Sequence, residues 1–166
     1  MNKLILNDQE YKGLVGKICR DIAVSGWRPD YIVGIGRGGL LPAVMISQYF
    51  GIKMCSLDIS LRDGGDTVSN FSMSEDAFSG KKILIVDDIN DTGATINWLM
   101  NDWRSSCQPE HQVWDEGVWN DNVKFAVVVD NWSSACQVTM DFTGMEVNKS
   151  EQDVWIEFPY EEWWTK

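Results

Sequence analysis

The chain has 166 residues, and 44% of them are hydrophobic. A chain of this length can bury one core without disulfides or structural metals. Its net charge of −11 and pI near 4.4 argue against a nucleic-acid or anionic-membrane surface, which would need a basic patch. No apolar stretch reaches the roughly 18 residues of a membrane helix, and the four cysteines form no Cys-x-x-Cys pair. We therefore expect a single domain without zinc or disulfides, in a reducing cytoplasm.

In chain order, hydrophobic spacing predicts alternating helices and strands. Helices are predicted over residues 8–25, 40–50 and 92–105, and strands over residues 31–35, 54–60, 82–86 and 124–129. The strands are apolar on both faces, which is typical of strands covered by helices on two sides. The sequence therefore predicts an α/β fold with a mostly parallel central sheet flanked by helices.

Two polar segments fall outside this alternation. Residues 61–80 are rich in Gly, Asp and Ser, lack periodicity, and are long enough to suggest a functional loop. Residues 107–122 form a second loop, which holds Trp114 and Trp119 and a histidine, His111, that we expect at the surface. Nine tryptophans are many for this length, and we expect most of them to cover core edges or a subunit interface.

A glycine-rich loop follows the strand predicted over residues 31–35. Gly34, Gly36 and Gly39 match the pattern G-x-G-x-x-G, and Asp58 lies about twenty residues further on, where a dinucleotide-binding fold has its ribose contact. Taken alone, this motif leaves open whether the loop binds NAD or another phosphate.

The stretch ILIVDDINDTGATI, residues 83–96, contains the most closely spaced candidate ligand-binding residues. Asp87 and Asp88 end a predicted strand, and Asp91 opens a threonine-containing loop that leads into a helix. A helix N-terminus offers unpaired N–H groups and partial positive charge, which suit a phosphate monoester. The neighbouring carboxylates can hold the vicinal hydroxyls of a ribose and a magnesium ion. The sequence therefore predicts a sugar-phosphate site at the carboxyl end of the sheet.

This stretch resembles the signature of the type I phosphoribosyltransferases, which bind 5-phosphoribosyl-1-pyrophosphate (PRPP). The resemblance implies one domain with a Rossmann-like fold over residues 1–166. Within it we expect a flexible hood over about 61–80, an insertion over about 107–122 and a base-binding segment over about 150–166. It also implies that the loop Gly36-Arg37-Gly38-Gly39 holds pyrophosphate, with a cis peptide between Gly36 and Arg37. The glycine pattern then no longer indicates a dinucleotide, and Asp58 is expected to be only a strand-end acid.

The resemblance assigns roles to individual residues. The PRPP site would comprise Gly36, Arg37, Gly38, Asp87, Asp88, Ile89, Asn90, Asp91, Thr92, Gly93, Ala94 and Thr95. Asp91 would act as general base, while Asp87 and Asp88 would hold the ribose hydroxyls, with Asp88 on the side of Mg²⁺. Arg37 would stabilise charge on the departing pyrophosphate.

The ending WIEFPYEEWW resembles the WIEQPWD-like ending of xanthine-guanine phosphoribosyltransferases. Trp155 would therefore stack on a purine, and the Ile156 backbone would contact the edge of the base. Where the purine enzymes usually have a lysine for the 6-oxo group, this sequence has Asn131, or Asp130 if the register shifts by one. Because asparagine can donate or accept, a 6-amino purine stays open. Arg62 is the one cation of the predicted hood.

The resemblance thus implies Mg²⁺-dependent transfer of the 5-phosphoribosyl group from PRPP to a purine base in purine salvage. The enzyme would be a homo-oligomer, a dimer or tetramer, that binds neither nucleic acid nor membrane. Two alternatives stay open: a PRPP-binding regulator or sensor without catalysis, and a phosphoribosyltransferase for a different base. The lack of Lys/Arg clusters disfavours a regulator that binds nucleic acid.

Overall fold

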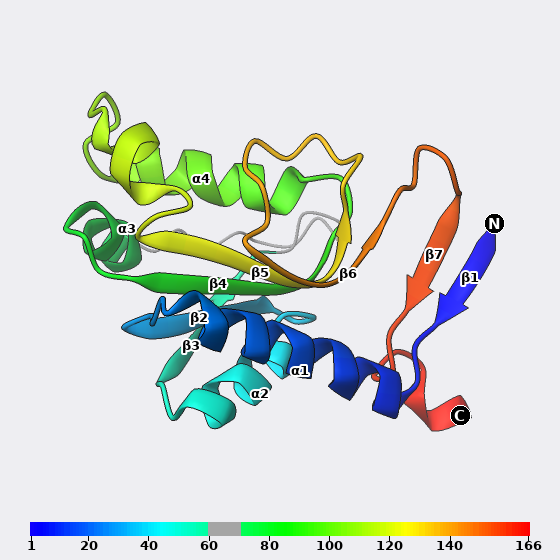
Figure 1. The fold of residues 1–166 in the computed structure, drawn as a ribbon. Coiled ribbons are helices and arrows are strands. Elements are labelled where there is room, and N and C mark those ends of the chain that lie inside the picture. The colour runs from blue at the N-terminus through cyan, green and yellow to red at the C-terminus, as the bar shows by residue number, and fades with distance from the viewer. Residues whose placement is uncertain (60–70) are drawn as a thin grey trace.

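The computed structural model describes residues 1–59 and 71–166. A parallel sheet of five strands forms its centre, in the order β3-β2-β4-β5-β6 (Figure 1). Its strands are β2 (Tyr31–Gly36), β3 (Met54–Asp58), β4 (Ile83–Asn90), β5 (Val123–Asn131) and β6 (Phe142–Val147). The helices are α1 (Asp8–Ser25), α2 (Leu40–Phe50), α3 (Phe71–Phe78) and α4 (Ala94–Ser106), with a π-helical turn at Trp114–Val118 and a 3₁₀ turn at Trp163–Thr165. The predicted α/β fold is confirmed.

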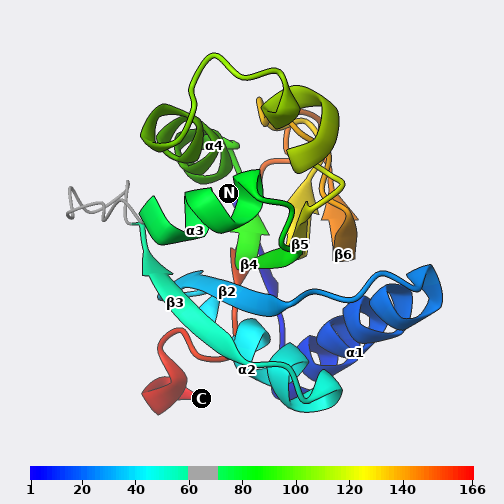
Figure 2. The same cartoon turned by 90° about the vertical axis from the view of Figure 1, so that its left-hand side faces the viewer.

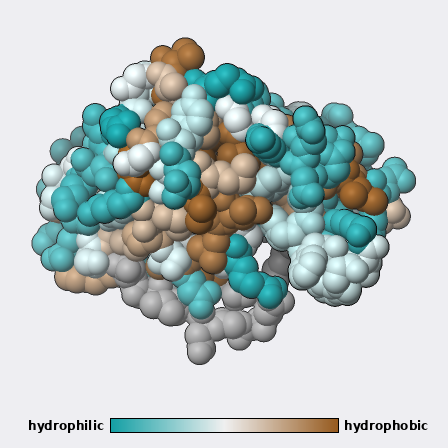
Figure 3. Space-filling model, turned by 90° about the horizontal axis from the view of Figure 1, so that it is seen from below, coloured by the Kyte–Doolittle hydropathy of each residue, from teal (hydrophilic) through white to brown (hydrophobic). Residues whose placement is uncertain are grey.

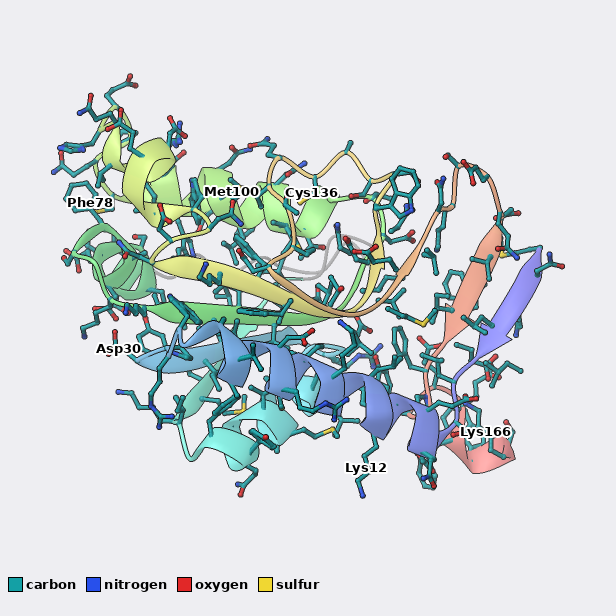
Figure 4. The ribbon with its side chains drawn as sticks, in the orientation of Figure 1. Lys12, Asp30, Phe78, Met100, Cys136 and Lys166 are labelled. Atoms are coloured by element: carbon teal, nitrogen blue, oxygen red, sulfur yellow. The ribbon has the colours of Figure 1, made fainter. Side chains whose placement is uncertain are left out.

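Helices cover both faces of the sheet, with α1 and α2 on one side and α3 and α4 on the other (Figures 1 and 2). Successive side chains of β2 pack on opposite faces of the sheet. Ile32 belongs to the core under α1 and α2, and Val33 belongs to the core under α3 and α4. This is why the strands are continuously apolar rather than alternating. Figure 4 shows Lys12, on the outer side of α1, pointing away from the sheet. No helix in the described part of the chain is long and apolar enough to cross a membrane.

The predicted boundaries of α1 and α2 agree with the structure, because both helices carry local stop signals. A capping box begins α1: the Asn7 side chain accepts from the Glu10 backbone N–H at 2.8 Å, and the Glu10 carboxylate accepts from the Asn7 N–H at 2.9 Å. Gly26 ends α1 and Gly51 ends α2, because glycine readily adopts the left-handed conformation at the end of a helix.

A second, two-stranded parallel sheet lies beyond one end of the main sheet and was not predicted. It pairs β1 (Asn2–Ile5) with β7 (Val154–Glu157), so the two ends of the chain meet (Figure 1). Glu157 ties them further, because its carboxylate binds Lys3 and Lys166 at 3.2 Å each. Each strand has four residues and its partner lies about 150 positions away. Nothing local in the sequence could therefore signal the pair.

Three other expectations need correction. β4 continues to Asn90, so Asp87 and Asp88 lie inside the strand rather than at its end, and Asp87 pairs with Val127 of β5. The helix predicted from residue 92 begins at Ala94, since Gly93 is left-handed. The segment predicted as a hood loop over 61–80 contains helix α3, whose Met73 and Ala77 are buried in the core that also contains α4 residues. Residues 61–70 of that predicted hood lie outside the described residues.

The polar segment 107–122 contributes to the core rather than covering its edge. Trp114 is fully buried and stacks on Trp119, with ring centroids 5.4 Å apart, and Trp103 and Phe125 complete this aromatic layer. His111 is exposed, as expected. By contrast, Trp132, Trp163 and Trp164 are more than half exposed. Trp27 and Trp98 are half-buried against the core, where the sequence analysis expects most of the tryptophans.

Replacing Trp114 with alanine is expected to lower the free energy of unfolding by about 3–5 kcal/mol, because a fully buried indole leaves a cavity under α3 and α4. Urea denaturation measures this change. Trp132→Ala is the matched control, since its side chain is 61% exposed and its loss should change stability by no more than about 0.5 kcal/mol. Equal effects of the two substitutions would contradict the assignment of the 107–122 segment to the core.

Candidate active site

A cavity of about 530 Å³ lies at the carboxyl ends of β2, β3 and β4, where β7 and the segment after it close one side. This is where open parallel sheets bind ligands. The residues predicted for the PRPP site all line it: Gly36, Arg37, Gly38, Asp87, Asp88, Ile89, Asn90, Asp91, Thr92, Gly93, Ala94 and Thr95. Trp155 and Ile156 of β7 line it too, whereas Asn131 does not. Asp58, at the end of β3, is a further lining residue.

The loop between β2 and α2 packs directly on the end of β4. The Gly36–Arg37 peptide is cis, as expected from the resemblance. A Cβ at Gly39 would strike the Val86 carbonyl oxygen and lie 2.7 Å from that of Ile35, so only glycine allows this approach. The backbone of the loop therefore lies beside the aspartates of β4, with the exposed Arg37 at the rim of the cavity.

The two adjacent aspartates of β4 are held by hydrogen bonds. Asp87 accepts from the Asp88 backbone N–H at 2.8 Å, and Asp88 accepts from the Ile89 N–H at 2.8 Å. The second oxygen of Asp88 accepts from the Tyr160 hydroxyl at 2.6 Å. Burial and the charge of Asp88 raise the pKa of Tyr160, so the phenol stays a donor.

The loop from Asp91 to Thr95 forms a cradle at the N-terminus of α4. Gly93 has φ of 88° and lies against the Cys136 backbone, which leaves no space for a Cβ. Cys136 flanks α4 in Figure 4. The segment after β5 braces this loop, because the Ala135 N–H donates to the Thr92 carbonyl at 3.1 Å. Such a braced helix N-terminus is suited to binding a phosphate group.

Asn131 helps to hold this loop in place and does not line the cavity. Its side chain is 6% exposed; its amide donates to the Asp91 carbonyl at 2.7 Å, and its oxygen accepts from the Lys149 N–H at 3.0 Å. Asp130, the alternative register, is also buried: it accepts from the Asn90 amide at 2.8 Å, and burial raises its pKa. Both predicted candidates for contact with the base therefore point to internal partners.

Lys149 is the functional candidate that the sequence analysis missed. It follows β6, lines the cavity, and its ammonium lies 2.8 Å from a carboxylate oxygen of Asp91. The lysine and aspartate side chains are only 18% and 20% exposed. A signal did exist, because Lys149 is the one Lys or Arg between Lys124 and Lys166, in an otherwise acidic part of the chain.

Negative charge dominates the cavity wall. Among the described lining residues, five carboxyl groups stand against two cations: Asp58, Asp87, Asp88, Asp91 and Glu161 against Arg37 and Lys149. Burial and the charge of Asp88 raise the pKa of Glu161. Carboxylates are the oxygen donors that Mg²⁺ prefers, and Mg²⁺ commonly binds through one or two of them together with substrate phosphates. No group of three or more His, Cys, Asp or Glu side chains that could hold a metal ion occurs among the described residues.

Comparisons with known proteins agree with this geometry. The sequence model of the family "Phosphoribosyl transferase domain" matches residues 2–162. The chain is 26% identical over 134 residues to the xanthine-guanine phosphoribosyltransferase of Idiomarina loihiensis, covering 78% of this chain and 70% of that protein. It is 23% identical over 128 residues to xanthine phosphoribosyltransferase 1 of Saccharomyces cerevisiae, covering 60% of this chain but only 61% of the yeast protein. The crystal structure of a purine phosphoribosyltransferase from Pyrococcus horikoshii Ot3 superposes with a TM-score of 0.68 at 23% identity, over 98% and 96% of the two chains.

Gly39→Ala is expected to lower the free energy of unfolding by about 1–3 kcal/mol, because the added methyl group meets backbone atoms that cannot turn aside. Gly13→Ala serves as the control: the position is exposed in the interior of α1 with nothing within 4 Å, and alanine should gain about 0.5–1 kcal/mol there. Urea denaturation of both variants gives the comparison. If Gly39→Ala were as stable as the wild type, the loop would not be packed on β4 as described.

Proposed function

The chain belongs to the phosphoribosyl transferase domain family, and given this membership we propose that it transfers the 5-phosphoribosyl group of PRPP to a 6-oxopurine, such as xanthine, guanine or hypoxanthine. The observation that carries the proposal is that one cavity combines the acid pair of β4, the cradle of α4, the arginine loop and an exposed tryptophan. These are partners for ribose hydroxyls, a 5-phosphate, a pyrophosphate and a flat base, respectively.

The sugar-phosphate half of the mechanism follows from the placement of these groups. The cradle at residues 91–95 would bind the 5-phosphate, and Asp87 and Asp88 would accept hydrogen bonds from the ribose hydroxyls. Breaking the bond from ribose C1 to pyrophosphate leaves positive charge on the sugar, as in glycoside chemistry, and negative charge on the leaving group. Arg37 and the backbone of its loop face that leaving group, where they would stabilise its charge.

Magnesium is part of the proposal because the cavity wall is acidic. A pyrophosphate would be repelled by five carboxyl groups unless a divalent cation came with it. Asp88, with Glu161 facing the same space, would hold the ion on the protein side. When bound, Mg²⁺ supplies charge neutralisation to the departing pyrophosphate.

The pair formed by Lys149 and Asp91 matches the edge of a 6-oxopurine. Its ammonium can donate to the 6-oxo group, and its carboxylate can accept the proton from N7 as N9 bonds to C1. A 6-amino purine would place a donor group against the ammonium, so that two donors face each other, which costs affinity. Lys149 thus takes the place in the proposal that the sequence analysis gave to Asn131.

The remaining base contacts come from β7. Trp155 is 38% exposed at the cavity and offers a stacking face, while the Ile156 backbone lines the same wall. The names of the two sequence relatives, which refer to xanthine and guanine, support a 6-oxopurine as the acceptor.

The oligomeric state and the cytoplasmic location stay predictions. A hydrophobic area gathers in the middle of the face seen in Figure 3, on the side of α1 and α2. Leu41 and Val44 of α2 are 42% and 44% exposed, so this side offers apolar surface for a second copy of the chain.

The test of the function is a panel of nucleobases with PRPP and Mg²⁺, followed by pyrophosphate release. We expect turnover with 6-oxopurines, and Asp91→Asn should lower kcat by roughly 10²–10⁴-fold because the general base is lost. The melting temperature of this variant serves as the control for folding. Tight PRPP binding without turnover of any base would favour a sensor, and turnover confined to another base would replace the proposed acceptor.

Lys149→Gln tests the recognition of the base. The variant should lose roughly tenfold or more in kcat/KM for a 6-oxopurine, because a charged hydrogen bond to the oxo group is replaced by a neutral one. Lys12→Gln is the control, since Lys12 is exposed on α1 and points away from the sheet (Figure 4). Unchanged kcat/KM in Lys149→Gln would remove Lys149 from the base site.

A further inference from the structure

We propose that Tyr160 is a positioning residue for Asp88, and that its hydroxyl fixes the orientation of this carboxylate on the pyrophosphate and metal side of the cavity. The inference rests on the function proposed above and adds to it a residue from outside the aspartate motif. Tyr160 itself would touch neither the ribose nor the base; it would act through Asp88.

The hydrogen bonds of Asp88 support this assignment. One carboxylate oxygen accepts from the Ile89 backbone N–H at 2.8 Å, and the other accepts from the Tyr160 hydroxyl at 2.6 Å. The first bond is local to β4, whereas the second joins residues 72 positions apart. Two donors on different oxygens fix both the position and the plane of the carboxylate, which a single donor would leave free to rotate.

The loop of Arg37 gives Asp88 little freedom on the other side. A Cβ at Gly38 would collide with the carboxylate of Asp88, so the bare Cα of the glycine lies directly against it. Asp88 is thus confined between Gly38 and Tyr160. A carboxylate that must bind a substrate or a metal gains from such confinement, because less freedom is lost on binding.

The ring of Tyr160 is itself held rigidly. It stacks on Phe158 with ring centroids 5.5 Å apart and an interplanar angle of 3°, and it meets the edge of Tyr11 at 6.1 Å. Tyr11 of α1 and Phe158 are only 3% and 2% exposed. Aromatic contacts of this geometry preorganise the phenol, so its hydroxyl is aimed before any ligand arrives.

Tyr11 provides an internal comparison. It belongs to the same aromatic cluster, but its hydroxyl is buried and has no hydrogen-bond partner among the residues that the structure describes. Removing the hydroxyl from Tyr11 therefore deletes no bond, whereas removing it from Tyr160 deletes the donor to Asp88. The pair of Tyr→Phe variants therefore compares the loss of a hydroxyl that donates to Asp88 with the loss of one that does not.

The experiment compares Tyr160→Phe and Tyr11→Phe by isothermal titration calorimetry with magnesium pyrophosphate, without base or turnover. Tyr160→Phe should weaken binding about tenfold, the effect of losing a hydrogen bond to a charged group, and Tyr11→Phe should stay within about twofold of the wild type. Both should melt within a few degrees of the wild type, because the rings remain. In steady-state kinetics, Tyr160→Phe should raise KM for PRPP while KM for the base changes little.

A double-mutant cycle tests whether Tyr160 affects binding through Asp88. In an Asp88→Asn background, adding Tyr160→Phe should change the affinity less than twofold, because the carboxylate on which it acts is gone. Wild-type affinity in Tyr160→Phe, an equal loss in Tyr11→Phe, or full additivity in the cycle would each overturn the positioning role. A wild-type protein that binds neither magnesium pyrophosphate nor PRPP would instead refute the proposed function, and the inference with it.

Discussion

The close packing of the glycine loop on the end of β4 is the constraint on which the rest of the site depends. Gly39 lies against backbone carbonyls of β2 and β4, and Gly38 lies against the carboxylate of Asp88. This approach puts the backbone of the loop directly against β4, so that Arg37 lines the same cavity as Asp87 and Asp88. Any side chain at these glycines would push the two halves of the anion site apart.

The sugar-phosphate half of the site is local, and sequence analysis could therefore predict it. Residues 87–95 run from the end of one strand into the next helix, so their spacing alone brings acids and cradle together. Four of the five strands of the main sheet, all except β6, were predictable for the same reason, since each is a local apolar run. By contrast, α3 was hidden among polar residues, and Lys149 and Tyr160 reach the cavity only through long-range packing. Their contacts join segments 58 and 72 positions apart, which local patterns in a single sequence do not reveal. For Lys149 the sequence offers only its isolation as a cation in an acidic part of the chain.

Asn131 illustrates why a position in a motif does not determine a role. It ends β5 as expected, but a buried amide must satisfy its hydrogen bonds, and here the nearest partners are the backbones of Asp91 and Lys149. The side chain of Asn131 therefore holds the segment that carries Lys149. A cation does line the cavity, but it is Lys149, from the segment after β6. In the proposed function this lysine would take the role that the resemblance places at the end of β5.

The base half of the site depends on the two ends of the chain. β7 carries Trp155 and Ile156, and it is held in place by pairing with β1 and by the bonds of Glu157 to Lys3 and Lys166. Four residues further on, the Tyr160 hydroxyl reaches back to Asp88 in the sugar-phosphate half. The segment that would seat the base is therefore fastened at one end to the N-terminal strand and at the other to the acid pair. The first attachment is a pairing of backbones, which different side chains at position 155 could keep, whereas the second depends on the hydroxyl of Tyr160.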